Sequence, residues 1–302
     1  MARPEALAFY EFFAGGGLAR LGLSPAFACV FANDHDPAKA AAYTRAFGAD
    51  VLREGDVEAL GPADLPGRAA LAWASFPCQD LSLAGARAGL DAPRSGAFWA
   101  FHHLMRALAA ERRAPRVICL ENVTGLLTSR RGADFERLVA ALDELGYRCG
   151  AVEIDASHFV PQSRRRLFVI AARSLHPTLV APRPDAFFHS DGVQAAVRRL
   201  PATLQRKVVW WRLPVPPLRN AALADLIDER EASWRSDSET QKLIRQMSPL
   251  QRERLEALRA SGGVHIGAVF RRMRVENGVK VQRAEARFDG LAGCLRTPAG
   301  GA

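Results

Sequence analysis

Short apolar segments and helix-like segments alternate over the first 172 residues, and this alternation constrains the fold more than any other feature of the chain. Each apolar segment has the length of a strand and ends in glycine or polar residues. The pattern predicts an α/β fold of Rossmann-like type, a mostly parallel sheet with helices on both faces that binds ligands at the carboxyl ends of its strands. We expect strands over residues 6–13, 26–32, 70–74, 117–120, 147–154 and 167–171, and helices over 18–23, 37–47, 96–108 and 134–145.

Charge and cysteine content narrow the class of protein. The net charge of +9 favours a polyanionic partner. Five cysteines without a Cys-x-x-Cys pair argue against a disulfide framework and against a thiolate zinc site, so we expect a reducing, cytoplasmic compartment (bacterial cytosol or nucleoid) and no metal. Apolar runs stay well short of the ~20 residues of a membrane span, and a secretory leader is not apparent.

Glycines and acids follow the first strands. The turn Ala14–Gly17 joins a strand to a helix, as in a nucleotide cradle, although glycine turns also merely connect elements. Asp34 ends the second strand, where a carboxylate can accept ribose hydroxyls. Asp36 precedes Pro37 and is placed to cap the next helix, which would leave Asp34 for a ligand. Asp56 is a third acid at a strand end.

A cysteine stands where the strand over residues 70–74 runs into a loop, in the stretch Ser75–Ser82. Many intracellular cysteines are small buried hydrophobes. Cys78 differs because Pro77 restricts its backbone and polar Gln79 and Asp80 follow at once.

Two later strands also carry polar groups. Glu121 lies at the end of one, and Gln162, Arg164 and Arg166 precede or open another. If the strand includes all three, they share one face and Arg165 takes the other. Three polar side chains on one face need an anion, another polar group or water.

The regular alternation of strand-like and helix-like segments stops after residue 172. Residues 173–302 contain many prolines and basic-aromatic patches at 206–212 and 270–274, which suit phosphates and bases or serve structural roles. Residues 238–261 predict one amphipathic helix. We therefore expect a catalytic and cofactor-binding domain over 1–172 and a smaller target-recognition region over 173–302.

Seven ordered segments resemble the DNA (cytosine-5)-methyltransferase family. They are FFAGGGLARLGL at 12–23, AND at 32–34, GD at 55–56, SFPCQDLSLAG at 75–85, RSGAFW at 94–99, LENVTGLL at 120–127 and PQSRRRLF at 161–168. The resemblance implies a Rossmann-like methyltransferase that uses S-adenosyl-L-methionine and releases S-adenosyl-L-homocysteine.

The resemblance also implies roles for single residues. Cys78 adds to carbon 6 of a flipped-out cytosine, Glu121 stabilises the activated ring, and Arg164 and Arg166 lie beside them. The implied cofactor residues are Phe13, Gly15, Gly17, Asp34, His35, Asp56 and Pro77, and the implied DNA contacts are Gln79, Ser82, Gln162 and Arg164. Leu18 and Asp34 depart from the family pattern, which usually has Gly and Glu there.

The resemblance leaves three functions open. The first is methylation of cytosine in double-stranded DNA, as in restriction-modification, and the second is methylation of tRNA. Relatives continue with two more segments after the stretch that resembles residues 295–302. A third interpretation is therefore a shortened product or subunit that needs a second polypeptide for activity.

Overall fold

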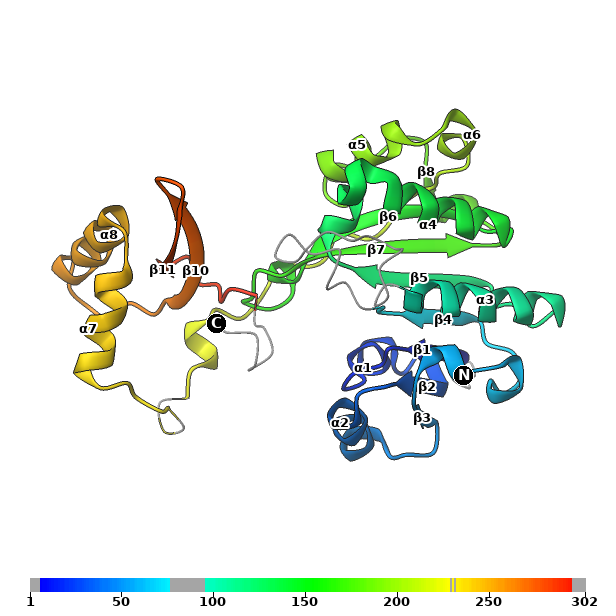
Figure 1. The fold of residues 1–302 in the computed structure, drawn as a ribbon, viewed down its shortest axis with the longest axis horizontal. Coiled ribbons are helices and arrows are strands. Elements are labelled where there is room, and N and C mark those ends of the chain that lie inside the picture. Colours follow the sequence, from blue (N-terminus) through cyan, green and yellow to red (C-terminus); the bar gives the residue numbers. More distant parts are fainter. Residues whose placement is uncertain (1–5, 77–95, 229, 231, 295–302) are drawn as a thin grey trace. The chain divides into compact units, whose positions relative to one another are not determined.

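The computed structural model describes residues 6–76, 96–228, 230 and 232–294. The chain forms two compact units (Figure 1). Unit 1 comprises Met1–Ile154 and Arg166–Pro214, and unit 2 comprises Asp155–Arg165 and Val215–Ala302. The boundary between the two units differs from the one expected at residue 172. Residues 173–214 fold with unit 1, and residues 155–165 fold with unit 2.

Unit 1 is built on a seven-stranded sheet with the order β3-β2-β1-β4-β5-β7-β6. Strands β1 to β5 pair in parallel along this order, whereas β7 runs antiparallel to β5. The chain order reverses between β1 and β4, and ligands bind at such a switch point in open α/β sheets. The strands are β1 (Leu7–Phe12), β2 (Phe27–Asp34), β3 (Leu52–Glu54), β4 (Leu71–Ala74), β5 (Val117–Asn122), β6 (Arg148–Asp155) and β7 (Arg165–Ala172).

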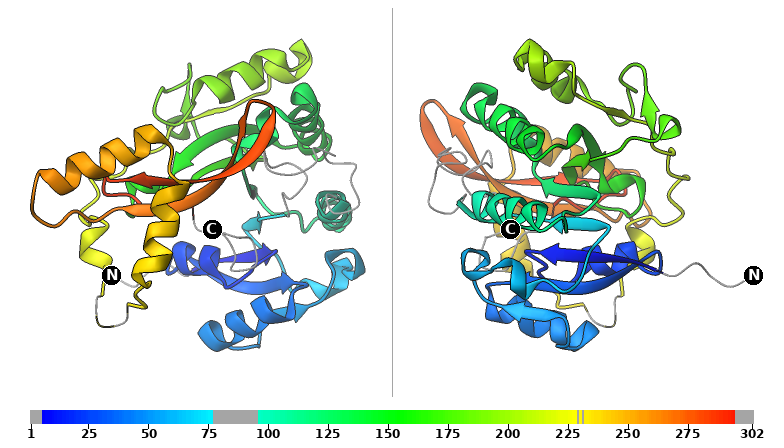
Figure 2. Two further views of the ribbon diagram at one scale, coloured as in Figure 1. Left: turned by 60° about the vertical axis from the view of Figure 1, so that its left-hand side comes forward. Right: turned by 90° about the vertical axis from the view of Figure 1, so that its right-hand side faces the viewer.

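Alternate residues of the strands enter different apolar clusters, as expected for strands buried on both faces. Tyr10 and Phe12 join the main core with residues of α3 and α4, whereas Phe9 packs in a second cluster that includes Leu23 of α1. Figure 2 shows α3 and α4 on one side of the sheet and α1 on the other. The helices of unit 1 are α1 (Leu18–Leu23), α2 (Pro37–Phe47), α3 (Gly96–Ala110), α4 (Ala133–Glu144), α5 (Asp191–Arg199) and α6 (Ala202–Gln205). Across the described ranges, no helix is both long and apolar enough to cross a bilayer.

The apolar part of residues 206–212 has a structural role, because Val209 and Trp211 are buried against β6, whereas the basic side chains of the segment stay exposed. Trp211 is 6% exposed, and its indole Nε1 donates to the carbonyl oxygens of Gly150 and Ile170 at 3.2 and 3.1 Å. The Val209 amide donates to the Cys149 carbonyl at 2.9 Å. Lys207 pairs with Asp143 at 2.7 Å. These contacts explain why the segment after residue 172 belongs to unit 1.

Unit 2 contains two helices where the sequence predicted one. Helix α7 (Asp237–Gln246) ends before Met247, and α8 (Pro249–Ala260) begins after Ser248, whose hydroxyl accepts the Gln251 amide at 3.3 Å. Proline lacks the amide hydrogen that a continuous helix would need at residue 249, so the single-helix prediction is wrong. The helices pack beside a hairpin of β10 (Ala268–Glu276) and β11 (Val279–Arg287).

Several short elements connect these parts. They are the 3₁₀ helices η1 (Val57–Ala59), η2 (Pro62–Asp64), η5 (Thr124–Leu127), η6 (Ser129–Gly132), η7 (Ala156–His158), η8 (Pro177–Leu179) and η9 (Ala224–Leu226), and the strands β8 (Val180–Ala181) and β9 (Trp210–Trp211).

Gly150 provides a test of the packing between β6 and β9. A Cβ atom there would lie 1.7 Å from the Val209 carbonyl oxygen, so Gly150→Ala must displace backbone. We expect it to lower the free energy of unfolding by roughly 1–3 kcal/mol, as overpacked cores do. Gly22→Ala is the matched control, because its Cβ would meet nothing within 4 Å. Thermal melts of both variants check this, and equal melting temperatures would contradict the packing.

Candidate active site

The register of three parallel strands sets the geometry of the site. Phe12 of β1 lies beside Ala74 of β4, and Ala74 lies beside Leu120 of β5. The chain therefore leaves these strands at one level of the sheet. The glycine turn, the segment that leads to Cys78, and Glu121 each begin one residue further along the chain. Adjacent strands are about 4.8 Å apart, so these three features are close neighbours.

The glycine turn after β1 needs left-handed backbone. Phe13, Gly15 and Gly17 have φ of 57°, 56° and 78°. At Gly17 a Cβ atom would also lie 2.4 Å from the Phe47 ring of α2. Glycine at 17 is thus required twice, by its backbone conformation and by the close approach of α2.

Asp34 ties the glycine turn to the end of β2. Its buried carboxylate accepts the Gly15 amide at 2.8 Å and the Asp36 amide at 2.9 Å. Asp36 caps α2, as the sequence predicted, by accepting the amides of Ala38 and Lys39. The Asp34 carboxylate thus already holds two backbone amides, one on each oxygen, before any ligand binds. His35 is mostly exposed beside it, with its Nδ1 3.9 Å from Asp34 Oδ1.

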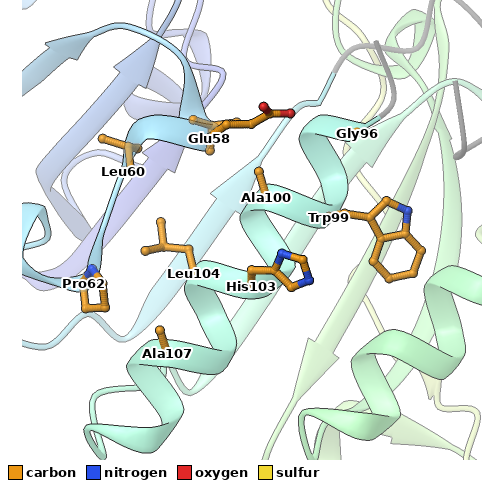
Figure 3. Close-up of a pocket in the computed structure, with 10 residues that line it drawn as sticks. Glu58, Leu60, Pro62, Gly96, Trp99, Ala100, His103, Leu104 and Ala107 are labelled. Atoms are coloured by element: carbon orange, nitrogen blue, oxygen red, sulfur yellow. The ribbon is translucent and has the colours of Figure 1, made fainter. Parts of the chain in front are cut away.

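Asp56 follows β3 and begins η1, where its Oδ1 accepts the Glu58 amide at 2.9 Å. The next residues, Val57 and Glu58, line a pocket of about 520 Å³ between this segment and α3 (Figure 3). Trp99 and His103 of α3 lie along its opposite wall. The segment after Asp56 therefore borders a largely apolar hollow.

The path towards Cys78 is anchored up to residue 76. The Ser75 amide donates to the Phe12 carbonyl at 3.3 Å, the Ser75 hydroxyl accepts the Trp73 indole at 2.9 Å, and Phe76 is buried against Phe98. The predicted site residues Pro77, Cys78, Gln79 and Ser82 lie outside the described residues. Ser75 follows β4 directly, so in the register of the sheet it corresponds to Phe13 after β1 and to Glu121 of β5.

Glu121 and Arg166 form an ion pair across β5 and β7. Arg166 Nε lies 2.8 Å from Glu121 Oε1, and both side chains are about four-fifths buried, with exposures of 18% and 23%. Antiparallel pairing of β5 with β7 brings the two residues to the same end of the sheet. A partly buried pair of this kind holds the carboxylate in one orientation.

The other predicted residues of the arginine segment belong to unit 2. Strand β7 starts at Arg165, so the expected common strand face for Gln162, Arg164 and Arg166 does not exist. Gln162 pairs with Ala292 in an isolated bridge. Arg164 donates its backbone amide to Asp155 Oδ1 at 2.8 Å and its guanidinium Nη1 to Cys294 Sγ at 3.2 Å.

Asp155 is a supporting residue that sequence reasoning missed. Burial works to raise its pKa, but the amides of Ser157 and Arg164 outweigh burial, and the pKa lies below the ordinary value. Arg165 Nε lies 3.6 Å from Asp155 Oδ2. The Asp-Ala-Ser sequence, in which a carboxylate caps two residues onward, was the available signal.

Glu11 is a second missed residue, beneath the glycine turn. It is 1% exposed, its Oε1 accepts the Arg20 amide at 3.3 Å, and burial raises its pKa to about 7. Arg20 also donates to the Tyr43 hydroxyl at 3.0 Å and stacks over the Phe47 ring. Helix α1, described throughout, has no fully buried residue, so these polar contacts help to hold it beside the packing of Leu23. A glutamate inside the apolar run LAFYEFF was the signal.

The mostly parallel sheet with helices on both faces is a Rossmann-like fold. A crystal structure of a Spodoptera frugiperda DNMT2 mutant shares this fold, with a TM-score of 0.50 at 20% identity over 74% of this chain and 60% of that one. The profile described as C-5 cytosine-specific DNA methylase matches residues 7–285. The chain belongs to that family.

Curated relatives match a little over half of this chain. The type II methyltransferase M.MspI of Moraxella sp is 32% identical over 178 residues, which is 58% of this chain and 41% of the relative. M.HhaI of Haemophilus parahaemolyticus is 30% identical over 170 residues, or 56% of this chain and 50% of the relative. The match thus spans half the length of these relatives or less.

Gly17→Ala tests the cradle. The substitution forces a Cβ into Phe47 and strains the backbone, so we expect at least a tenfold loss in affinity for S-adenosylhomocysteine, measured by calorimetry. Gly16→Ala is the control, because it has no left-handed φ and its Cβ would meet nothing within 4 Å. Equal affinities for the two variants would contradict the proposed cradle.

Glu11→Gln tests the buried carboxylate. The pKa rises from 4.5 to about 7 on folding, so the stability that Glu11 contributes is full below pH 4.5 and is lost as pH rises through 7. That loss amounts to at most about 3 kcal/mol. We expect Glu11→Gln to gain stability relative to the wild type between pH 5 and pH 8. Thermal melts at both pH values check this, and a constant difference would contradict it.

Proposed function

We propose that this chain transfers a methyl group from S-adenosyl-L-methionine to carbon 5 of a flipped-out cytosine in a specific sequence of duplex DNA, through a covalent adduct of Cys78. The observation that carries the proposal is the register of β1, β4 and β5, in which Phe12, Ala74 and Leu120 lie side by side. It supports a cofactor cradle, a nucleophile-bearing loop and a carboxylate on three adjacent strands. Such convergence suits a reaction among three groups.

Carbon 5 of cytosine becomes nucleophilic only after electrons enter the ring. The Cys78 thiolate forms a bond to carbon 6, the pair of the 5,6 double bond forms a 4,5 double bond, and the 3,4 pair moves to nitrogen 3, which takes a proton from Glu121. The 4,5 pair then bonds carbon 5 to the methyl group, whose bond to sulfur breaks, and the 3,4 double bond forms again. Solvent takes the carbon 5 proton, the freed pair restores the 5,6 double bond as the thiolate departs, and nitrogen 3 returns its proton to Glu121. Roughly a few per cent of a free thiol is ionised at neutral pH, so a cation would help, and the family resemblance implies Arg164 for this role.

Glu121 is proposed to hold ring nitrogen 3 and the exocyclic amine while charge develops. The ion pair with Arg166 supports this role, because the guanidinium Nε lies 2.8 Å from one carboxylate oxygen and so holds the side chain in place. A group already fixed in place costs little reorganisation during reaction. Arg166 is accordingly a positioning residue for Glu121.

The described cradle fits a methyl donor that carries a ribose and an adenine. Asp34 uses one acceptor position on each oxygen for backbone amides, which leaves capacity for hydroxyl donors. His35 is exposed beside it, and the pocket after Asp56 offers apolar surface to a ring. When bound, S-adenosyl-L-methionine supplies an electrophilic methyl group. Phe13, Gly15, Gly17 and Pro77 complete the proposed cofactor set.

Duplex DNA is the proposed substrate, with Gln79, Ser82, Gln162 and Arg164 as contacts around the flipped base. The family description and the type II names of the relatives support DNA and a role in restriction-modification. Transfer to tRNA is the alternative, and competition between duplex DNA and tRNA for methyl transfer separates the two. A second polypeptide has no support among the relatives.

Glu121→Gln tests the proposed role of the carboxylate. The amide cannot protonate nitrogen 3 or hold the same charge, so we expect methyl transfer to duplex DNA to fall by roughly 10²–10⁴-fold. Incorporation of labelled methyl groups from S-adenosylmethionine provides the measurement. Glu144→Gln, an exposed carboxylate at the end of α4, is the control and keeps the wild-type rate. A Glu121→Gln rate within a few-fold of the control would exclude the role.

A further inference from the structure

The hairpin of unit 2 is a long, regular ribbon. Strands β10 and β11 each span nine residues and pair from Ala268–Arg287 to Glu276–Val279. Asn277 and Gly278 form the two-residue turn with φ of 49° and 78°, values that suit the natural twist of a hairpin. Nine residues extend about 30 Å. The hairpin stands beside α7 and α8 (Figure 1).

One face of this ribbon is occupied by its own charges. Arg274 Nε donates to Glu285 Oε1 at 2.6 Å, and Arg283 Nε donates to Glu276 Oε1 at 2.8 Å. Arg272 stacks over the Phe270 ring at 4.8 Å. The register places all of these side chains on the same side, which we call the paired face. Its arginines mainly hold the two strands together.

The opposite face has a different composition. Arg271, Met273 and Val275 of β10 lie beside Ala284, Gln282 and Lys280 of β11, and these two strands place no carboxylate on this side. Met273 and Val275 are 59% and 70% exposed. Among the described residues, Gln282 and Lys280 make no side-chain hydrogen bond or ion pair. We call Arg271, Met273, Val275, Lys280 and Gln282 the open face.

Support from the helices stops at the base of the ribbon. Ala284 and Ala286 are buried in a cluster with Met247, Leu243 and Leu255 of the α7–α8 region. Towards the turn, Val275 and Val279 are both largely exposed. Towards the turn, the open face thus presents Lys280, Gln282 and the mostly exposed apolar side chains of Met273 and Val275 to solvent.

We propose that the open face of the β10–β11 hairpin enters the major groove of the substrate duplex and reads its base sequence. This proposal rests on the proposed function. A two-stranded ribbon fits the major groove, where arginine recognises guanine, glutamine recognises adenine, and apolar side chains contact the thymine methyl group. Lys280 suits a phosphate contact. The absence of carboxylates from this face complements the charge of DNA.

Site-specific photocrosslinking separates the two faces. Met273 on the open face and Val279 on the paired face are similarly exposed, at 59% and 63%. A benzophenone-bearing phenylalanine is placed at either position in the full chain, which is then irradiated with a pool of duplexes carrying a randomised centre. We expect at least fivefold more DNA adduct from position 273. Equal yields, no adduct from 273, or adduct to tRNA but not to duplex DNA would overturn the proposal.

Sequence preference supplies a second measurement. Arg271→Ala and Gln282→Ala should each lower discrimination at one base pair by about 5- to 150-fold, the usual range for a specific base contact. Arg272→Ala, the neighbouring arginine on the paired face, should keep the wild-type preference. Preferences are determined by bisulfite sequencing after methylation of the same duplex pool. Unchanged preferences in both open-face variants would refute the reading role.

The two measurements distinguish this proposal from the proposed function. Crosslinking needs no methyl transfer, so adducts from position 273 by a chain that transfers no methyl group would contradict the enzymatic function and retain the hairpin as a DNA reader. Methyl transfer with unchanged sequence preferences and no adduct from position 273 would retain the enzymatic function and contradict the reading role of the hairpin.

Discussion

The alignment of Phe12, Ala74 and Leu120 across β1, β4 and β5 is the constraint on which the rest of unit 1 depends. Because a one-residue slip would reverse every side chain, the buried residues on both faces fix this register. The glycine turn, the approach to Cys78 and Glu121 then emerge together. Asp34 and Arg166 act on this frame from neighbouring strands, one by holding the turn and the other by holding Glu121.

Sequence reasoning succeeded where a structure depends on neighbouring residues. The predicted helix over 37–47 has the observed bounds, because Asp36 and Pro37 specify its start locally. The predicted strands of the sheet are present, and the family resemblance is confirmed by the profile match. The same reasoning could not predict which polar residues are buried or which residues distant in sequence are in contact. The hydrogen bond between Gly15 and Asp34 joins residues that are 19 positions apart. Residues 173–214 belong to unit 1, where Val209 packs closely against Gly150.

The hairpin shows why composition alone left two interpretations of the basic-aromatic patch at 270–274. Adjacent arginines point to opposite sides of a strand, so Arg271 and Arg272 meet different environments. The register of β11 decides which residues face them. Glu285 engages Arg274 on one side, whereas Ala284 and Gln282 share the other side with Arg271 and Met273. Within five residues the sequence thus contributes to both a charge-paired face and a face with exposed apolar side chains.

The most direct test of the account is covalent trapping on duplex DNA that contains 5-fluorocytosine, in the presence of S-adenosylmethionine. Fluorine at carbon 5 cannot leave as a proton does, so the thiolate cannot be eliminated after methyl transfer and the adduct persists. The account predicts a denaturation-resistant complex with the wild-type chain and none with Cys78→Ala. No complex with the wild type, or a complex that survives Cys78→Ala, would contradict it.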